Sequence, residues 1–165
     1  KGLSILSNKY NISIGAILSG GDKNNRKHVE NFAKALNLEN HIRFVGFVSN
    51  EEIVQLYLQS IALVMPSYFG PTNLPPLEAF NLSVPVLYSN IKGLREQVGD
   101  AALLMDLEDP NSMALHLKNL IEDKNVRNKL VEEGQKRLKY FNSYDRVGVL
   151  TDIINDFRHK RYSWS

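Results

Sequence analysis

The segment PSYFGPTNLPPLEAF, residues 66–80, has the residue types of an anion-binding turn followed by a helix. Pro75 and Pro76 suit the first helical positions, because the N–H groups there have no partner inside a helix. The backbone amides of Asn73, Leu74 and Leu77, together with the positive end of the helix dipole, would form a cradle for a phosphate or diphosphate. The segment therefore predicts a phosphate-binding turn.

Glu78 is the one acidic side chain of this segment. We expect it in the first turn of the helix, facing the same loop. A carboxylate there can accept hydrogen bonds from two vicinal hydroxyls, such as those of a ribose. It can equally complement the helix dipole in an ordinary Pro-rich turn. The chemistry of the segment leaves both interpretations open.

Short aliphatic runs alternate with longer amphipathic stretches along the chain. Several runs are apolar on both faces, which predicts parallel strands covered by helices on both sides. The expected fold class is α/β, a Rossmann-like, doubly wound parallel sheet whose sites lie at the carboxyl ends of the strands. The predicted strands are residues 12–18, 42–47, 61–67, 84–89 and 101–106, and the predicted helices are 25–37, 50–59, 75–82, 93–98, 110–122, 124–139 and 143–159.

The composition indicates one globular domain, residues 1–165, with 43% hydrophobic and 23% charged residues. The absence of cysteine excludes disulfides, thiolate metal sites and a cysteine nucleophile. No apolar run approaches the roughly 18 residues of a membrane span, and we expect a cytoplasmic protein. Four scattered histidines predict no metal site.

Positive charge is concentrated in the C-terminal part of the chain. Residues 1–117 hold nine Lys/Arg against eleven Asp/Glu, whereas residues 118–165 hold eleven against seven. A net charge of +2 does not indicate a nucleic-acid partner. A solvated helix face explains the basic segment most simply. The ending HKRYSWS, with Tyr162 and Trp164 after a cationic patch, also suggests peripheral contact with the inner membrane face.

The stretch 66–113 resembles the signature region of family 4 (group 1) retaining glycosyltransferases, in their C-terminal, donor-binding domain. Residues 41–67 resemble the strand, helix and strand that precede this region in the family. The matching pieces are Pro66-Ser67, Leu74-Pro75, Leu77-Glu78-Ala79, Pro85-Val86 and Gly99 to Leu104.

This resemblance implies the C-terminal half of a GT-B enzyme, a hexosyltransferase in glycan or polysaccharide assembly. Such enzymes move a hexose, with mannose as one candidate here, from a nucleotide diphosphate sugar to a glycan or lipid-linked acceptor. They need no cofactor and usually no metal. A non-catalytic flavodoxin-like nucleotide-binding module and another GT-B enzyme, such as a nucleotide-sugar epimerase, are the alternatives.

The resemblance also assigns roles to residues of the segment 66–80. Glu78 matches the second Glu of the family's Glu-x7-Glu motif, which binds the ribose hydroxyls of the donor. The first Glu falls at Gly70, so its role is dispensed with or passes to Thr72, Asn73 or a backbone group. Asn73 and Leu74 match positions whose amides meet the distal phosphate.

Two further turns match the family near the donor. Phe47 and Val48 correspond to the turn that holds the nucleobase against backbone groups. Gly20 and Gly21, in the turn SGGDKNN, are secondary candidates, since this turn lacks the third glycine of a dinucleotide fingerprint and could be a plain strand-to-helix turn.

The chain begins within an amphipathic helix pattern that runs directly into a strand pattern. We therefore expect a fragment that lacks its first strand and the N-terminal acceptor domain. The family's cationic pair for the donor diphosphate would also precede Lys1. No catalytic residue is assigned, and the fragment alone is expected to transfer no sugar.

Overall fold

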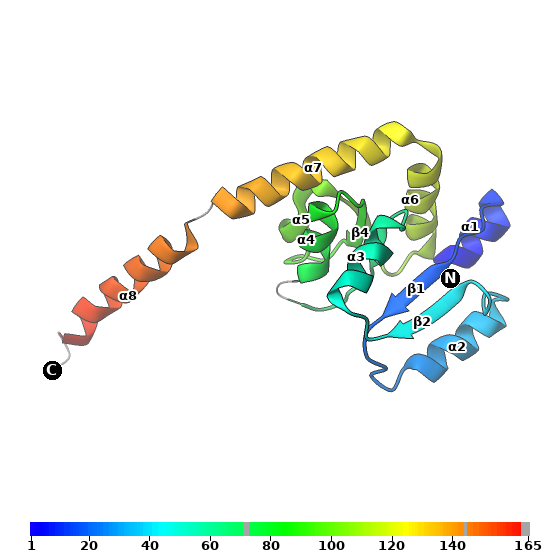
Figure 1. Cartoon of the computed structure of the whole chain (residues 1–165), viewed down its shortest axis with the longest axis horizontal. Coiled ribbons are helices and arrows are strands. Elements are labelled where there is room, and N and C mark those ends of the chain that lie inside the picture. The colour runs from blue at the N-terminus through cyan, green and yellow to red at the C-terminus, as the bar shows by residue number, and fades with distance from the viewer. Residues whose placement is uncertain (71–72, 144, 163–165) are drawn as a thin grey trace.

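The computed structural model describes residues 1–70, 73–143 and 145–162, with the backbone alone for 159–162. Its strands are all parallel and alternate with helices (Figure 1). This confirms the predicted α/β class. The strands are β1 (Ala16–Ser19), β2 (Ile42–Gly46), β3 (Leu63–Met65), β4 (Val86–Ser89) and β5 (Ala102–Met105).

The helices follow the predicted order along the chain. α6 has the predicted bounds, and α4 begins one residue earlier than the predicted helix at 75–82. A 3₁₀ turn, Gly99–Ala101, precedes β5. The helices are α1 (Gly2–Tyr10), α2 (Arg26–Ala35), α3 (Asn50–Leu58), α4 (Leu74–Asn81), α5 (Arg95–Val98), α6 (Pro110–Glu122), α7 (Lys124–Ser143) and α8 (Arg146–Tyr162).

The described strands form two hydrogen-bonded groups rather than the single sheet expected from the sequence. β1 pairs with β2, while β3, β4 and β5 form a second sheet in that order. Within the second sheet, Val86 of β4 lies between Leu63 and Ala102. No strand among the described residues connects β1 to β3, so the sheet is interrupted there.

The β strands are shorter than the apolar runs that predicted them. The run at 12–18 yields a strand only from Ala16, although Ile12 and Ile14 also pack against a buried cluster. Apolar side chains thus mark burial over the whole run, whereas the hydrogen-bonded ladder covers only part of it.

β4 separates two halves of the hydrophobic core. Val86 and Tyr88 face a cluster that includes Phe80 of α4. Leu87, pointing to the opposite face, joins a cluster with Leu6 of α1 and residues of α6. This alternation is the two-residue period of a strand buried on both faces.

α7 packs across α4 and α5 (Figure 1). Gly134 allows the close approach, because a Cβ there would lie 2.9 Å from Cδ1 of Phe80. The Gln135 side chain donates to the Phe80 carbonyl at 2.7 Å, and Arg137 Nε donates to the Gln97 carbonyl at 3.0 Å. α7 therefore fixes both helices that follow the β3 and β4 strands.

Candidate functional site

The carboxyl end of β3 leads into the start of α4, where the sequence predicts the donor site. α4 begins at Leu74, with Pro75 and Pro76 inside its first turn. Because the helix begins earlier than Pro75, Glu78 lies beyond the first turn, which corrects the expected first-turn position.

Tyr57 of α3 holds the Glu78 side chain. The buried Tyr57 hydroxyl donates to Glu78 Oε2 at 3.1 Å, while Glu78 itself remains exposed. Burial raises the pKa of Tyr57 well above its ordinary value, and the nearby Glu78 charge and its hydrogen bond raise the pKa further. The phenol therefore stays protonated as a donor, and the exposed carboxylate is held in one place with capacity to accept further hydrogen bonds.

The main chain of Asn73, which precedes α4, is bonded to Gln97 of α5. Gln97 Oε1 accepts the Asn73 N–H at 3.2 Å, and Gln97 Nε2 donates to the Asn73 carbonyl at 2.5 Å. The Asn73 amide, expected to be free for a phosphate, therefore already has a protein partner. The Leu74 amide occupies the first helical position, where an N–H has no partner within the helix.

The side chain of Asn73 is also engaged. Its Nδ2 donates to the Tyr88 hydroxyl at 2.5 Å, and a Cβ at Gly70 would lie 2.7 Å from Asn73 Oδ1. Gly70 has φ +146°, which favours glycine. At the position where the family has its first Glu, both the positive φ and the close Asn73 side chain therefore favour glycine. Thr72, the other candidate for that role, lies outside the described residues.

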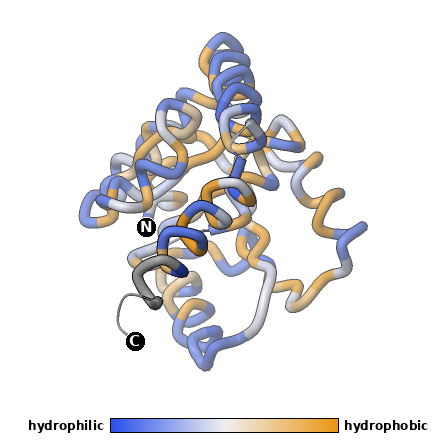
Figure 2. The backbone as a smooth tube through the Cα atoms, turned by 90° about the vertical axis from the view of Figure 1, so that its left-hand side faces the viewer, coloured by the Kyte–Doolittle hydropathy of each residue, from blue (hydrophilic) through white to orange (hydrophobic). Residues whose placement is uncertain are grey.

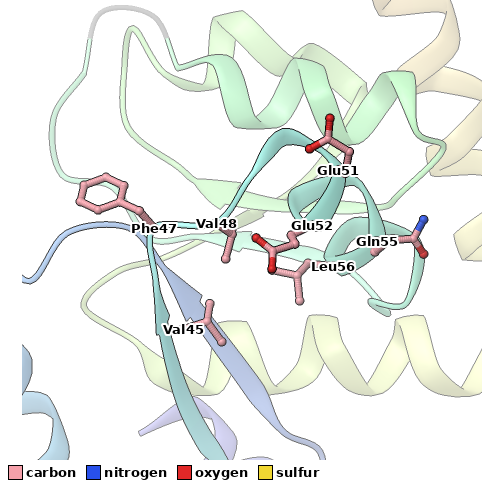
Figure 3. A pocket seen from close by; sticks show the side chains of 7 residues that line it. All are labelled: Val45, Phe47, Val48, Glu51, Glu52, Gln55 and Leu56. Carbon is pink, nitrogen blue, oxygen red and sulfur yellow. The ribbon is translucent and has the colours of Figure 1, made fainter.

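Phe47 and Val48 lie in the turn between β2 and α3, beside a hollow of about 450 Å³ (Figure 3). Phe47 is 87% exposed. A capping box fixes the turn, because the Ser49 N–H donates to Glu52 Oε2 at 2.7 Å and the Glu52 N–H donates to Ser49 Oγ at 3.2 Å. The lining residues are Val45, Phe47, Val48, Glu51, Glu52, Gln55 and Leu56.

The Gly-rich turn after β1 adjoins the same place. The Gly20 N–H donates to the Gly46 carbonyl at 2.7 Å, and a Cβ at Gly21 would lie 3.1 Å from the Phe47 ring. The carboxyl ends of β1 and β2 therefore bring Gly20 and Gly21 to Phe47, as expected for turns at one edge of a parallel sheet.

The predicted residues thus form two groups. Gly70, Asn73, Leu74 and Glu78 surround the start of α4, and the two glycines gather with Phe47 and Val48 at the β1–β2 edge. α3 connects them, since its first turn borders the hollow and its Tyr57 binds Glu78.

Sequence reasoning missed three side chains, Tyr57, Tyr88 and Gln97. All three are buried, and each reaches the site from an element outside the segment 66–80. The apolar spacing of 50–59 predicts that Tyr57 faces inward, but nothing in the sequence signals its partner. Within the described ranges, no three His, Asp or Glu side chains gather as a metal site.

The Glycosyl transferases group 1 family matches residues 4–137 of the chain. An Escherichia coli protein, "O-antigen chain mannosyltransferase B", is 35% identical over 120 residues, which is 73% of this chain and 31% of that protein. The chain spans about a third of the length of the curated relatives it matches.

Solved structures share the fold. The chain superposes with a TM-score of 0.76 on Anabaena Alr3699/HepE in complex with UDP-glucose, at 21% identity over 96% of this chain and 44% of that one. The C-terminal domain of a Francisella tularensis glycosyl transferase group 1 family protein (LpcC) gives a TM-score of 0.70 at 24% identity, covering 84% of this chain and 74% of that one. With its family match over most of its length and the motif residues gathered at the start of α4, this chain belongs to the group 1 glycosyltransferases.

Proposed function

We propose that this chain is the donor-binding part of a retaining glycosyltransferase and binds a nucleotide diphosphate sugar at the carboxyl ends of β1, β2 and β3. Glu78 accepts hydrogen bonds from the ribose hydroxyls, and the Leu74 amide meets the distal phosphate. The base lies against Phe47 and Val48.

The observation that carries this proposal is the Tyr57–Glu78 hydrogen bond. Glu78 is exposed, yet its carboxylate is fixed by a buried phenol from a different helix. A glutamate that served only the helix dipole would need no such partner, because the dipole acts on charges in the first turn and Glu78 lies beyond it. A fixed carboxylate suits the recognition of two vicinal hydroxyls.

The hollow beside Phe47 and Val48 supports a place for the base. Its volume of about 450 Å³ lies within the roughly 300–1,000 Å³ range of small-molecule sites. Figure 3 shows Val45, Val48 and Leu56 near one another with the Glu52 side chain beside them, while the Phe47 ring points away from them. The apolar side chains suit a flat, partly apolar base.

The transferred group in this proposal is a hexose, with mannose as the first candidate. The Escherichia coli relative is named as a mannosyltransferase acting on the O-antigen chain. By analogy, the whole protein would add a hexose to a glycan or lipid-linked acceptor during polysaccharide assembly. The family match does not favour a flavodoxin-like module or an epimerase.

A nucleotide panel tests the proposal. The melting temperature of the chain and the Kd, measured by calorimetry, are determined with GDP, UDP and ADP and with their hexose conjugates. One nucleotide should bind and raise the melting temperature, since a ligand at 100 times its Kd adds about 2.7 kcal/mol of stability. Failure of all three nucleotides to bind would contradict the proposal.

In the whole protein, a further parallel strand would lie between β1 and β3. The described strand order, β2-β1 and β3-β4-β5, equals the order 3-2-1-4-5-6 of a doubly wound sheet with its strand 1 missing. This strand would complete the donor domain, and an acceptor domain would accompany it.

Peripheral membrane contact through the C-terminal segment is a separate part of the proposal. α8 extends from the body of the molecule, with apolar and polar positions alternating along it (Figures 1 and 2). Its apolar residues Val147, Val149, Leu150, Ile153, Ile154 and Phe157 are exposed. Tyr162 and Trp164, on which the sequence prediction rests, have side chains outside the described part. Among the described residues, no helix is long and apolar enough to cross a membrane.

Co-sedimentation with vesicles containing anionic lipid tests this contact. The chain should bind such vesicles, and truncation after Asp156 should weaken binding by removing Phe157 and the basic and aromatic residues that follow it. Equal binding by the truncated chain would contradict the membrane proposal without affecting the donor site.

A further inference from the structure

We infer that Gln97 is a positioning residue of the donor site, which holds the main chain before α4 in place where the family's first glutamate is absent. The inference rests on the proposed function, since the loop that Gln97 holds is the one proposed to meet the donor diphosphate.

The Gln97 side chain bonds to Asn73 as a neighbouring strand would. It accepts the Asn73 N–H at 3.2 Å and donates to the Asn73 carbonyl at 2.5 Å. Both backbone polar groups of one residue are thus satisfied by one carboxamide. We call this pair of hydrogen bonds from Gln97 to Asn73 the clamp. Gln97 is 9% exposed, and Arg137 of α7 donates a hydrogen bond to the main-chain carbonyl of Gln97, so α7 holds the residue that forms the clamp.

The side chain of Asn73 is diverted from its usual role. Asparagine before a helix ordinarily caps it by accepting an N–H from the first turn. Here Asn73 has extended backbone angles, φ −107° and ψ 124°, and makes no side-chain cap. Its Nδ2 donates instead to the hydroxyl of Tyr88, which is completely buried and also lies 3.4 Å from Gln97 Oε1. Asn73 is therefore held by backbone and side chain together.

Gly70 and Asn73 form a dependent pair. Any side chain at position 70 would bring its Cβ to 2.7 Å from Asn73 Oδ1 and 3.0 Å from Asn73 Nδ2. Such contacts are shorter than packed atoms tolerate, and Gly70 also has a positive φ. A glutamate at position 70 and the present Asn73 conformation thus exclude each other. In this chain, the hydrogen bonds from Gln97 and Tyr88 fix Asn73 instead.

The consequence for the site concerns the Leu74 amide. Since Gln97 holds the peptide groups on either side of the Asn73 α-carbon, it also fixes the direction of the next N–H, at the first position of α4. A preorganised donor binds an anion without first being ordered, so loss of the clamp should weaken diphosphate binding.

Gln135 provides a matched control for the experiment. Its carboxamide also holds main chain of α4, through the Phe80 carbonyl at 2.7 Å, but at the opposite end of the helix. We compare Gln97→Met with Gln135→Met, since methionine has a similar length and no hydrogen-bonding carboxamide. The measurements are stability in urea, the Kd for the nucleotide diphosphate that binds the wild type, and hydrogen exchange at the Asn73 amide.

Both variants should lose some stability. Gln97→Met should weaken nucleotide diphosphate binding at least fivefold and speed Asn73 exchange, whereas Gln135→Met should change the Kd less than twofold and leave that exchange unchanged. Equal Kd changes in the two variants would overturn the inference while leaving the proposed function intact.

Two further outcomes separate the inference from the proposed function. If the wild type binds no nucleotide, the proposed function fails. Separately, if hydrogen exchange at the Asn73 amide is unchanged in Gln97→Met, Gln97 does not hold Asn73 and the inference is wrong. If Gln97→Met does not fold, Gln97→Glu replaces it. This variant keeps an acceptor for the Asn73 N–H and loses the donor to the Asn73 carbonyl, so it should weaken binding, and unaltered binding would count against the clamp.

Discussion

The sheet β3–β5 and the pair β1–β2 differ in how far their strands are covered. All four residues of β4 are buried, whereas three of the four residues of β1 are exposed. Helices pack on both faces of β4, and its side chains join two buried clusters. Because apolar burial is the main source of stability, the β3–β5 region should hold most of it.

This difference divides the candidate site. Glu78 and Asn73 lie on the well-covered β3–β5 side, and their partners Tyr57, Tyr88 and Gln97 are buried. Phe47 lies on the less covered β1–β2 side and is highly exposed. The part of the candidate site proposed to bind ribose and phosphate is therefore held by buried partners, whereas the part proposed to hold the base lies on the less covered pair β1–β2.

The largest expected effect is a difference in stability between equivalent strand residues of the two regions. Leu87→Ala removes a completely buried side chain and should lower the free energy of unfolding by about 2–5 kcal/mol. Ile17→Ala removes a side chain that is 54% exposed and should cost less than about 1 kcal/mol. Urea unfolding measures both. Similar losses would show that the two regions contribute equally.

A smaller effect concerns Tyr57 and its dependence on pH. The pKa of Tyr57 is raised in the folded state. The contribution of the protonated phenol to the free energy of unfolding is therefore fully present below the unfolded pKa of about 10, and it is lost as pH rises through the folded pKa. Tyr57→Phe should lower stability by about 0.5–1.5 kcal/mol near neutral pH through the lost hydrogen bond. Above pH ~10, the free energy of unfolding of Tyr57→Phe should fall less steeply with pH than that of the wild type.

Tyr140→Phe is the control for this measurement, because Tyr140 is 59% exposed on α7. Urea unfolding is followed at several values of pH. If both variants track the wild type through the alkaline range, the phenol of Tyr57 is not the group responsible.

The smallest expected effect is that of chelation. Neither region gathers three potential metal ligands among the described residues. Nucleotide binding should therefore have the same Kd, within about twofold, with EDTA and with added magnesium. Calorimetry provides the test. Binding that EDTA abolishes and magnesium restores would mean that a metal completes the site.

Local signals account for the elements predicted most accurately from the sequence. α6 begins where expected because Asp109 caps it, accepting the Asn111 N–H at 2.9 Å, and Pro110 occupies its first position. The motif around Glu78 likewise lies at the carboxyl end of a strand, as predicted.

The contacts between distant segments could not be predicted in the same way. Asn73 and Gln97 are 24 residues apart, and Tyr57 and Glu78 are 21 apart. A glutamine on a short helix is usually a surface residue, but here the Gln97 side chain bonds to Asn73 and to the buried Tyr88. The motif predicted the place of the candidate site, while tertiary packing determined which side chains bond to its residues.

The central claim, that Glu78 binds ribose, is tested most directly by comparing an ordinary nucleotide with its 2′,3′-dideoxy form. Each charge-assisted hydrogen bond contributes about 1.5–3 kcal/mol. Glu78→Ala should therefore weaken binding of the ordinary nucleotide at least tenfold, with little change in the melting temperature of the protein. The dideoxy nucleotide should bind wild type and Glu78→Ala equally. Glu132→Ala, which alters an exposed carboxylate of α7, should match wild type with both ligands. If Glu78→Ala binds the ordinary nucleotide as tightly as wild type does, the ribose contact is wrong.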